Sequence, residues 1–291
     1  MLSLKRNAPA KVNLALDILR KREDGYHDMR MVMQTVSLCD VVEVAECADG
    51  FSLQMEGFTP PEGRKTLEQR AAEAFFEELG IPVPGLAVSI AKNTPAYAGL
   101  GGGSADVAAL LRGLRDVWCP GMPGETLERI GFAVGSDMPF CIRGGTALAE
   151  SRGEVLTDLQ PLPDCWFVIC KPDFDIPTPA LFARVRPDAF VHRPDIDGMM
   201  AALERSDLEG VAARLCNVFE EILPDGCEEV FAIRRRLVEL GAMGALMSGS
   251  GPTVFGLFCE ETAARAAAAE LRQRYHQTYL AQPVKKFAPG E

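Results

Sequence analysis

The spacing of apolar and polar residues predicts β-strands at the start of the chain. Residues 12–19 begin with alternating apolar and polar side chains, which is typical of a strand with one buried face. Residues 31–44 contain apolar stretches that are interrupted at Cys39 and Asp40. We therefore expect two strands in the second segment, with a turn at this interruption.

Helical spacing begins later in the first half. Residues 67–79 combine apolar spacings of three and four with many Ala and Glu residues, so they predict a helix that ends at Gly80 and Pro82. Residues 86–90 predict a further strand. A run of glycines follows, and residues 105–114 then contain strong helix formers.

The chain contains a proline-rich segment at residues 159–163. We place a domain boundary there, with domains at 1–160 and 161–291. Strands and helices alternate in both parts, which predicts an α+β protein of two domains. The elements expected in the second part are a strand at 166–170, a helix at 228–240, a strand-loop-strand unit through 247–252, a helix at 262–275 and a strand near Tyr279.

Composition agrees with a folded protein of this size. Of 291 residues, 47% are hydrophobic and 24% are charged, which is ordinary globular usage. The net charge of -11 argues against a protein that coats nucleic acid or an anionic membrane, because both partners require clustered positive charge. The first thirty residues nevertheless contain seven basic against four acidic residues, a local excess that is either chance or the mark of an anionic ligand.

The nine cysteines are scattered and form no CxxC pair. Several lie within apolar runs, so we expect buried free thiols rather than disulfides or a zinc site. The chain shows neither an uninterrupted signal-peptide core at its start nor an apolar run of about 20 residues. These features together favour a reducing, cytoplasmic location.

The most distinctive segment is the glycine run at residues 99–103, which directly precedes a predicted helix. Glycines allow the backbone to turn tightly and present several N–H groups, and a helix N-terminus adds unpaired donors and partial positive charge. Phosphate is the natural ligand, and a ligand-free turn is the alternative. The segment lacks the lysine of a P-loop and fits neither GxGxxG nor GxSxG, so an ordinary NTPase, dinucleotide enzyme or serine hydrolase is disfavoured.

The order of several motifs resembles that of the GHMP kinases, and the resemblance spans nearly the whole chain. The opening Pro-Ala-Lys-Val-Asn and the Asp-Gly-Tyr-His element resemble in particular the members that act on a cytidine diphosphate derivative. The motifs are Pro9-Ala10-Lys11-Val12-Asn13-Leu14, Asp24-Gly25-Tyr26-His27, the loop from Gly99 to Ser104, Gly135-Ser136-Asp137-Met138-Pro139-Phe140, Gly144-Gly145-Thr146-Ala147 and Ser248-Gly249-Ser250-Gly251.

The resemblance implies a two-domain fold with the active site in a cleft between a nucleotide-binding N-terminal domain and a smaller C-terminal domain. It also implies ATP-dependent phosphorylation of the 2-hydroxyl of a methylerythritol that is joined through a diphosphate to cytidine. Such a reaction belongs to the non-mevalonate synthesis of isoprenoid precursors. Both expected partners are small molecules, and the expected state is a monomer or a homodimer.

Two residues are the expected catalytic pair. Asp137 lies in a turn-forming segment and would accept the proton of the attacking hydroxyl as general base. Lys11 would lie beside it, favour the ionised carboxylate and stabilise the charge of the moving phosphoryl group. Without the resemblance, Asp137 could merely cap a turn and Lys11 could be an exposed strand residue.

A cytosine pocket is expected around Tyr26 and His27. Tyr26 would stack on one face of the base, Phe182 would stack on the other, and His27 would contact the base edge. Asn13 and Thr178 would make further polar contacts with the substrate. As an alternative, the Tyr-His pair could simply close a hairpin.

The resemblance also indicates a set of ATP-binding residues around the glycine loop. Magnesium would be held mainly by the phosphates of ATP, with Ser104 as a protein ligand, because no cluster of carboxylates marks a metal cage. The loop at residues 248–252 would shape the cleft. The expected ATP-binding residues are Lys92, Pro95, Ala96, Tyr97, Ala98, Gly99, Leu100, Gly101, Gly102, Gly103, Ser104 and Ala105.

Three positions depart from the family pattern. Tyr97 replaces a small residue before the glycine loop, Ser151 stands where glycine is usual, and Thr66 stands where an asparagine often holds the adenine. The rival functions are a homoserine, mevalonate or galactose kinase, a nucleotide-binding regulator without turnover, and a structural interaction protein. The Tyr26-His27 element disfavours the first group, and the presence of both Lys11 and Asp137 disfavours the regulator.

Overall fold

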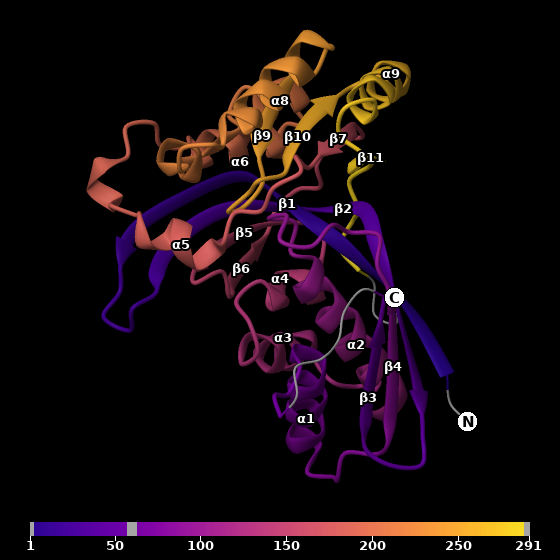
Figure 1. Cartoon of the computed structure of the whole chain (residues 1–291). Helices are drawn as coiled ribbons and strands as arrows, with labels where there is room; N and C mark the ends of the chain where they lie inside the picture. The colour runs from indigo at the N-terminus through magenta and orange to yellow at the C-terminus, as the bar shows by residue number, and fades with distance from the viewer. Residues whose placement is uncertain (1–2, 57–62, 288–291) are drawn as a thin grey trace.

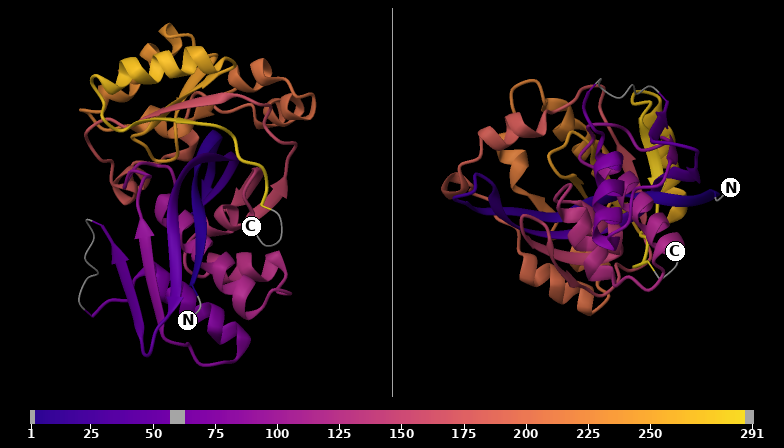
Figure 2. Two further views of the ribbon diagram at one scale, coloured as in Figure 1. Left: turned by 90° about the vertical axis from the view of Figure 1, so that its right-hand side faces the viewer. Right: turned by 90° about the horizontal axis from the view of Figure 1, so that it is seen from below.

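The computed structural model describes residues 3–56 and 63–287. The chain folds into two halves, and each of them contains helices and strands (Figure 1). Two long strands dominate the first half: β1 (Ser3–Lys21) and β2 (His27–Glu46). They pair antiparallel along nearly their whole length. Both strands extend from the region of the C-terminal half into the N-terminal half (Figure 2).

Strand β2 changes its second neighbour part-way along. Residues 41–46 pair with β4 (Leu86–Ala91), whereas residues 29–34 pair with β5 (Thr146–Ser151). The remaining strands of this seven-stranded sheet are β3 (Phe51–Met55) beside β4, β6 (Val155–Asp158) beside β5, and β8 (Cys216–Asn217) beside β1.

The expected turn at Cys39 and Asp40 is wrong, because β2 runs through both residues without a break. The Asp40 side chain is fully buried, and one of its carboxylate oxygens accepts hydrogen bonds from the backbone N–H groups of Asn93 (2.6 Å) and Thr94 (2.7 Å). A buried carboxylate with such partners is satisfied inside the protein, so the acidic residue does not require a turn.

Four helices pack together among the described residues of the N-terminal half. The expected helix at residues 67–79 is confirmed as α1 (Leu67–Leu79), which ends at Gly80 in the left-handed conformation. Helix α2 (Gly102–Trp118) begins within the glycine run and packs against β1 and β2. Helices α3 (Gly124–Phe132) and α4 (Met138–Arg143) complete the group.

The C-terminal half contains a four-stranded antiparallel sheet in the order β11-β7-β10-β9. Its strands are β7 (Trp166–Cys170), β9 (Gly244–Met247), β10 (Val254–Phe258) and β11 (Thr278–Ala281), and α8 (Glu228–Glu239) and α9 (Glu261–Arg272) pack against them. The shorter elements are α5 (Thr178–Ala183), α6 (Ile196–Glu204), α7 (Leu208–Ala212) and the 3-10 helices η1 (Pro187–Ala189) and η2 (Val218–Ile222).

Strand β1 is buried on both faces, since residues 8–18 are all buried, and this explains its nearly continuous apolar sequence. Val12 and Leu14 belong to a core that also contains Phe167 and Phe255 of the C-terminal half. Leu16 and Ile18 belong to the other core, which includes most of α2. A bulge between Asn13 and Ala15 produces this change of side.

The last described residues return to the N-terminal half. Pro283 forms a bridge with Val36, and Lys286 forms one with Gly144. The segment after β11 therefore lies against the first sheet, and so does β8 from the C-terminal half. Both crossings help to join the two halves along β1 and β2.

Candidate active site

Lys11 is buried at the centre of the site, with only 5% of its surface exposed. Its Nζ donates a hydrogen bond to Asn13 Oδ1 at 2.8 Å and forms an ion pair with Asp137 Oδ2 at 3.4 Å. Lys11 and Asn13 are two residues apart on β1, so both side chains leave the same face of the strand. The predicted catalytic residues and Asn13 are thus together in the structure.

The glycine loop lies directly against Lys11. The Lys11 backbone N–H donates to Leu100 O at 2.9 Å, and a Cβ added to Gly101 would stand 3.0 Å from Lys11 Cγ. Gly101 has φ 67 and is the N-cap of α2, whose first turn contains no acidic residue. The unpaired N–H groups of this helix end therefore face the site without a competing side-chain cap.

Not all residues of the predicted ATP loop offer their side chains to a ligand. Ala98 and Leu100 are buried in the apolar core, so these two residues can contribute only their backbone. Tyr97 has φ 50 and a 78% exposed side chain. The Tyr97 side chain is therefore mostly surrounded by solvent.

Asp137 precedes α4 and has the N-cap position of that helix, but its side chain makes no capping hydrogen bond. About a third of the side chain is exposed, and it faces Lys11. The alternative that Asp137 only caps a turn is therefore not supported. A carboxylate held beside a buried ammonium, with one side open, is suitable for accepting a proton from a bound hydroxyl.

The loop after β9 closes the site from the C-terminal half. Ser248 Oγ donates to Gly99 O at 3.0 Å, and a Cβ on Gly249 would lie 2.8 Å from that same oxygen. Asn217 on β8 donates from its side chain to the carbonyl oxygens of Met247 and Gly249, each at 2.8 Å. The two glycine-rich loops therefore fit against each other through backbone atoms, which agrees with a shaping role for residues 248–252.

Lys92 lies behind the glycine loop and is held by two buried carboxylates. Its Nζ forms ion pairs with Asp106 at 2.7 Å and with Asp40. Burial lowers the pKa of Lys92, but the two acids outweigh burial and raise it above the ordinary value. Burial raises the pKa of Asp106 to about 7, against the opposing attraction of Lys92. Lys92 thus supports the base of the loop, since a Cβ on Gly102 would stand 3.5 Å from its Nζ.

Two of the predicted base-binding residues, His27 and Phe182, lie together at the end of the hairpin between β1 and β2. The rings of His27 and Phe182 lie 5.4 Å apart, and Phe182 packs edge-on against Phe219 at 5.0 Å. Thr178 Oγ1 lies 2.8 Å from Ser250 Oγ, which connects α5 to the late glycine loop. Tyr26 is 51% exposed.

Sequence reasoning did not identify Asp40, Asp106 and Asn217 as part of the site. Asp106 could have been noticed, because it is an acidic residue within the apolar helix that follows the glycines. Asp40 was misread as a turn, and Asn217 carries no local signal. Thr66, which departs from the family pattern, is the N-cap of α1 and accepts a hydrogen bond from Gln69 N at 3.2 Å.

Comparison with known proteins identifies the family. Residues 66–145 match the model of the GHMP kinases N terminal domain, and residues 199–277 match that of the GHMP kinases C terminal domain. A 4-diphosphocytidyl-2-C-methyl-D-erythritol kinase from Pelotomaculum thermopropionicum is 42% identical over 93% of this chain and 94% of its own length. The one from Bacillus subtilis is 39% identical over 94% of each chain. The chain belongs to the 4-diphosphocytidyl-2-C-methyl-D-erythritol kinase family.

Solved structures agree with this assignment. The kinase is similar to a crystal structure of 4-(cytidine 5'-diphospho)-2C-methyl-D-erythritol kinase, with a TM-score of 0.81 and 34% identity over 96% of this chain and 99% of that one. A homoserine kinase from Cytophaga hutchinsonii has a TM-score of 0.75 at 17% identity, which shows the shared fold alone. The GHMP fold and an ATP-dependent phosphotransferase activity are thus confirmed. Among the described residues, no helix of the kinase has the length and apolar character to span a membrane.

A substitution at Gly99 tests the contact between the two loops. Gly99 has φ +73, and a Cβ there would stand 2.1 Å from Ser248 O. We expect Gly99→Ala to separate the loops and to lower the unfolding free energy by at least about 1–2 kcal/mol, the cost of a left-handed alanine alone. Chemical denaturation measures the loss. Gly121→Ala is the control because it meets no atom within 4 Å; equal stability of the two variants would contradict the account.

Removal of the Lys92 ammonium tests the buried acidic pair. Lys92→Met leaves Asp40 and Asp106 without their cation, and we expect a loss of about 3–5 kcal/mol in unfolding free energy. A buried carboxylate that loses its neighbouring cation has a raised pKa in the folded state. Folding is then more favourable while the carboxylate is protonated, and this advantage is lost as the pH rises and the carboxylate ionises. The loss should therefore be larger in alkaline than in mildly acidic buffer.

The control is Lys65→Met, which removes an exposed ion pair with Glu73 and should cost at most about 1 kcal/mol. Denaturation curves of both variants across this pH range provide the comparison. A loss in Lys92→Met that is small, or that does not change with pH, would show that the two carboxylates do not depend on this lysine.

Proposed function

We propose that the kinase transfers the γ-phosphoryl group of ATP to the 2-hydroxyl of 4-diphosphocytidyl-2-C-methyl-D-erythritol, a step of the non-mevalonate route to isoprenoid precursors. The observation that carries the proposal is the pair of Lys11 and Asp137, 3.4 Å apart, beside the N-terminal end of α2. The relatives described above supply the identity of the acceptor.

The glycine loop suits the phosphates of ATP. Its backbone N–H groups and the positive end of the α2 dipole favour anionic oxygens. Lys11 adds a full positive charge that is shielded from water, and in such surroundings a charge acts more strongly on developing negative charge. Positioning and electrostatic stabilisation supply most of the acceleration in phosphoryl transfer, and both are built into this part of the chain.

Asp137 would accept the proton of the 2-hydroxyl as the oxygen attacks the γ-phosphorus. Its carboxylate makes no capping bond to α4, so it is available for this task. Lys11 keeps the carboxylate in place, and Asn13 orients the ammonium by accepting its hydrogen bond at 2.8 Å. In this account Lys11 serves both the base and the phosphoryl group.

Magnesium is part of the proposal as a companion of ATP. Within residues 3–56 and 63–287, no group of three or more His, Cys, Asp or Glu side chains could hold a metal ion. In the proposal, nucleotide phosphates and water hold most of the ion's coordination sphere, with the Ser104 hydroxyl in the first turn of α2 as a protein ligand. The ion would neutralise charge on the phosphates.

The cytidine end of the substrate would bind at the tip of the hairpin between β1 and β2. Tyr26 and Phe182 offer aromatic faces, and His27 offers a hydrogen bond to the base edge. Burial, with a smaller effect of Lys21, lowers the pKa of His27, so this side chain remains neutral at physiological pH. Neutral imidazole has one donor and one acceptor nitrogen, which suits a nucleobase edge.

We further propose that the kinase acts in the cytoplasm as a monomer or a homodimer. All nine cysteines are free, which suits a reducing compartment. The proposed partners are ATP and the cytidine diphosphate substrate, without nucleic acid or membrane.

The acceptor is tested by ADP release with a panel of alcohols. We expect turnover with 4-diphosphocytidyl-2-C-methyl-D-erythritol and only background ADP release with homoserine, mevalonate or galactose, because these three lack a base for the Tyr26-His27 hairpin. Phosphorus NMR of the product identifies the phosphorylated hydroxyl. Preferred turnover of one of the other alcohols would contradict the proposal.

Asp137→Asn tests the general base. The amide is isosteric but cannot accept the hydroxyl proton, so we expect kcat to fall about 10²- to 10⁴-fold while both ligands still bind. The matched control is Asp116→Asn, which alters a carboxylate that is also ion-paired, to Arg6 at 2.9 Å, but outside the site. Nearly normal turnover by Asp137→Asn would exclude the assigned role.

His27→Ala tests the base pocket. Loss of one hydrogen bond and of the contact with Phe182 should raise KM for the cytidine substrate about tenfold, with little change in KM for ATP. In the wild type this KM should be constant near neutral pH and should rise only on the acid side of the ordinary histidine pKa of about 6.5, because the pKa of His27 is lowered. The control is His192→Ala, which removes an exposed imidazole that lies 3.2 Å from Glu221. An unchanged KM in His27→Ala would show that this histidine does not bind the base.

A further inference from the structure

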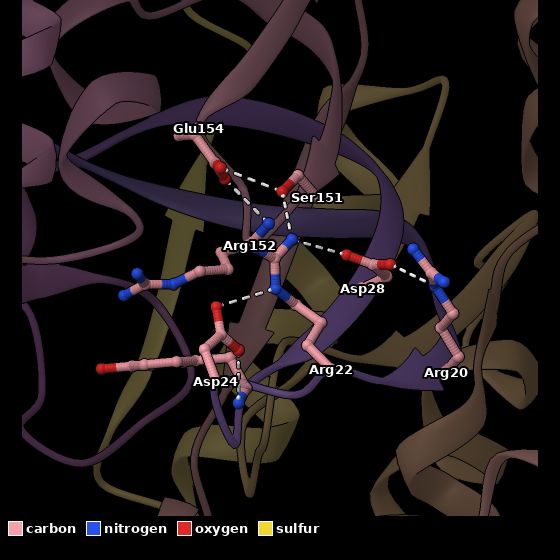
Figure 3. A network of polar contacts seen from close by, with 8 residues as sticks. Arg20, Arg22, Asp24, Asp28, Ser151, Arg152 and Glu154 are labelled. Atoms are coloured by element: carbon pink, nitrogen blue, oxygen red, sulfur yellow. Dashed lines mark hydrogen bonds and ion pairs between the residues drawn. The ribbon is translucent and has the colours of Figure 1, made fainter.

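Two turns meet beside the proposed base pocket: residues 22–26, between β1 and β2, and residues 151–154, between β5 and β6 (Figure 3). Arg22 connects them. Its guanidinium donates to Asp24 Oδ2 at 3.0 Å, to Asp28 Oδ1 at 2.8 Å and to Ser151 Oγ at 3.0 Å. The hairpin that carries Tyr26 and His27 is thus attached to the second turn by a branched polar network.

The second turn has an unusual backbone that its side chains stabilise. Ser151 has φ 62, in the left-handed region that favours glycine. Its hydroxyl accepts from Arg22 and donates to Glu154 Oε1 at 2.9 Å. Glu154 Oε2 accepts the backbone N–H of Arg152 at 2.7 Å. These bonds compensate the strained position and fix the direction in which the Arg152 side chain leaves the turn.

Arg152 places its guanidinium over an aromatic ring of the base pocket. Its Cζ is 3.6 Å from the centroid of the Tyr26 ring and 4.9 Å from that of Phe132 in α3. The Arg152 Nε atom is buried and has no hydrogen-bond partner among the described residues. The contact with the rings is therefore the principal interaction of this part of the side chain.

Arg152 covers one face of the Tyr26 ring, and the residue as a whole is still 51% exposed. We infer that Arg152 is a positioning residue for the substrate base: it supports one face of the Tyr26 ring and leaves the opposite face for cytosine. An exposed tyrosine without this support would have to be ordered when the substrate binds, at a cost in affinity. The inference rests on the proposed role of Tyr26 in binding cytidine.

The chemistry of the pair explains why arginine suits this position. A planar guanidinium lies flat on an aromatic face, whereas a lysine ammonium is a compact point charge. Arg152→Ala removes the plane and the charge, and Arg152→Lys retains only the charge. The alternative to a positioning role is that the Arg152 guanidinium occupies the space that the cytosine base requires for binding.

The test is a set of KM measurements for the cytidine substrate. We expect Arg152→Ala to raise this KM about 3- to 30-fold, the range of a cation–aromatic contact, with KM for ATP and kcat changed less than about twofold. Arg152→Lys should give an intermediate KM. The matched control is Arg274→Ala, which removes a guanidinium over Tyr275 at 5.2 Å and should leave both KM values unchanged.

A double-mutant cycle with Tyr26→Ala shows whether Arg152 acts through the tyrosine. We expect Arg152→Ala to have little further effect in the Tyr26→Ala background, because a positioning residue has no effect once its target is absent. Independent effects that add in the double variant would overturn the inference, and so would a lower or unchanged KM in Arg152→Ala alone. If Tyr26→Ala itself left KM unchanged, the proposed base pocket would be wrong instead.

Ser151→Ala provides a second variant if Arg152→Ala folds poorly. It removes the hydroxyl that joins Arg22 to Glu154 but retains the guanidinium, so the same KM should rise to a smaller extent. Thermal melting of each variant separates loss of fold from loss of affinity. An unchanged KM in a well-folded Ser151→Ala protein would show that the network does not position the ring.

Discussion

The site depends on one buried ammonium. Lys11 is removed from water by the glycine loop and by the loop after β9, and an isolated buried charge would be very costly. Asn13 and Asp137 supply the partners that make it acceptable. In the proposed reaction, the same low-dielectric environment that requires these partners would strengthen the action of the ammonium on phosphoryl oxygens.

The long strand β1 carries Lys11 and Asn13 and holds the lysine in its buried position. It is covered on both faces, and its bulges decide which side chains face which half of the molecule. One face of its middle part belongs to the core shared with the C-terminal half, while Lys11 and Asn13 leave the other face. The kinase therefore uses the central strand of its fold both as core and as the carrier of the site.

Much of this arrangement could be predicted from the sequence. The apolar spacing predicted α1 at its observed bounds, and the glycine run does precede a helix, α2. Asp40 was misinterpreted because local patterns cannot distinguish a buried acid with distant backbone partners from a turn. The support of Tyr26 by Arg152 was also invisible, because it depends on two turns that are 129 residues apart at Arg22 and Ser151. Elements and motifs formed by neighbouring residues can be predicted from a sequence, whereas contacts between residues that are distant in the chain cannot.

The central claim is that the buried Lys11 ammonium drives phosphoryl transfer. The most direct measurement is single-turnover transfer from radiolabelled ATP to the cytidine diphosphate acceptor by Lys11→Met, with ligand affinities determined by calorimetry. The account predicts a transfer rate at least about 100-fold below that of the wild type, with folding retained and both ligands still bound. A transfer rate close to that of the wild type would contradict it.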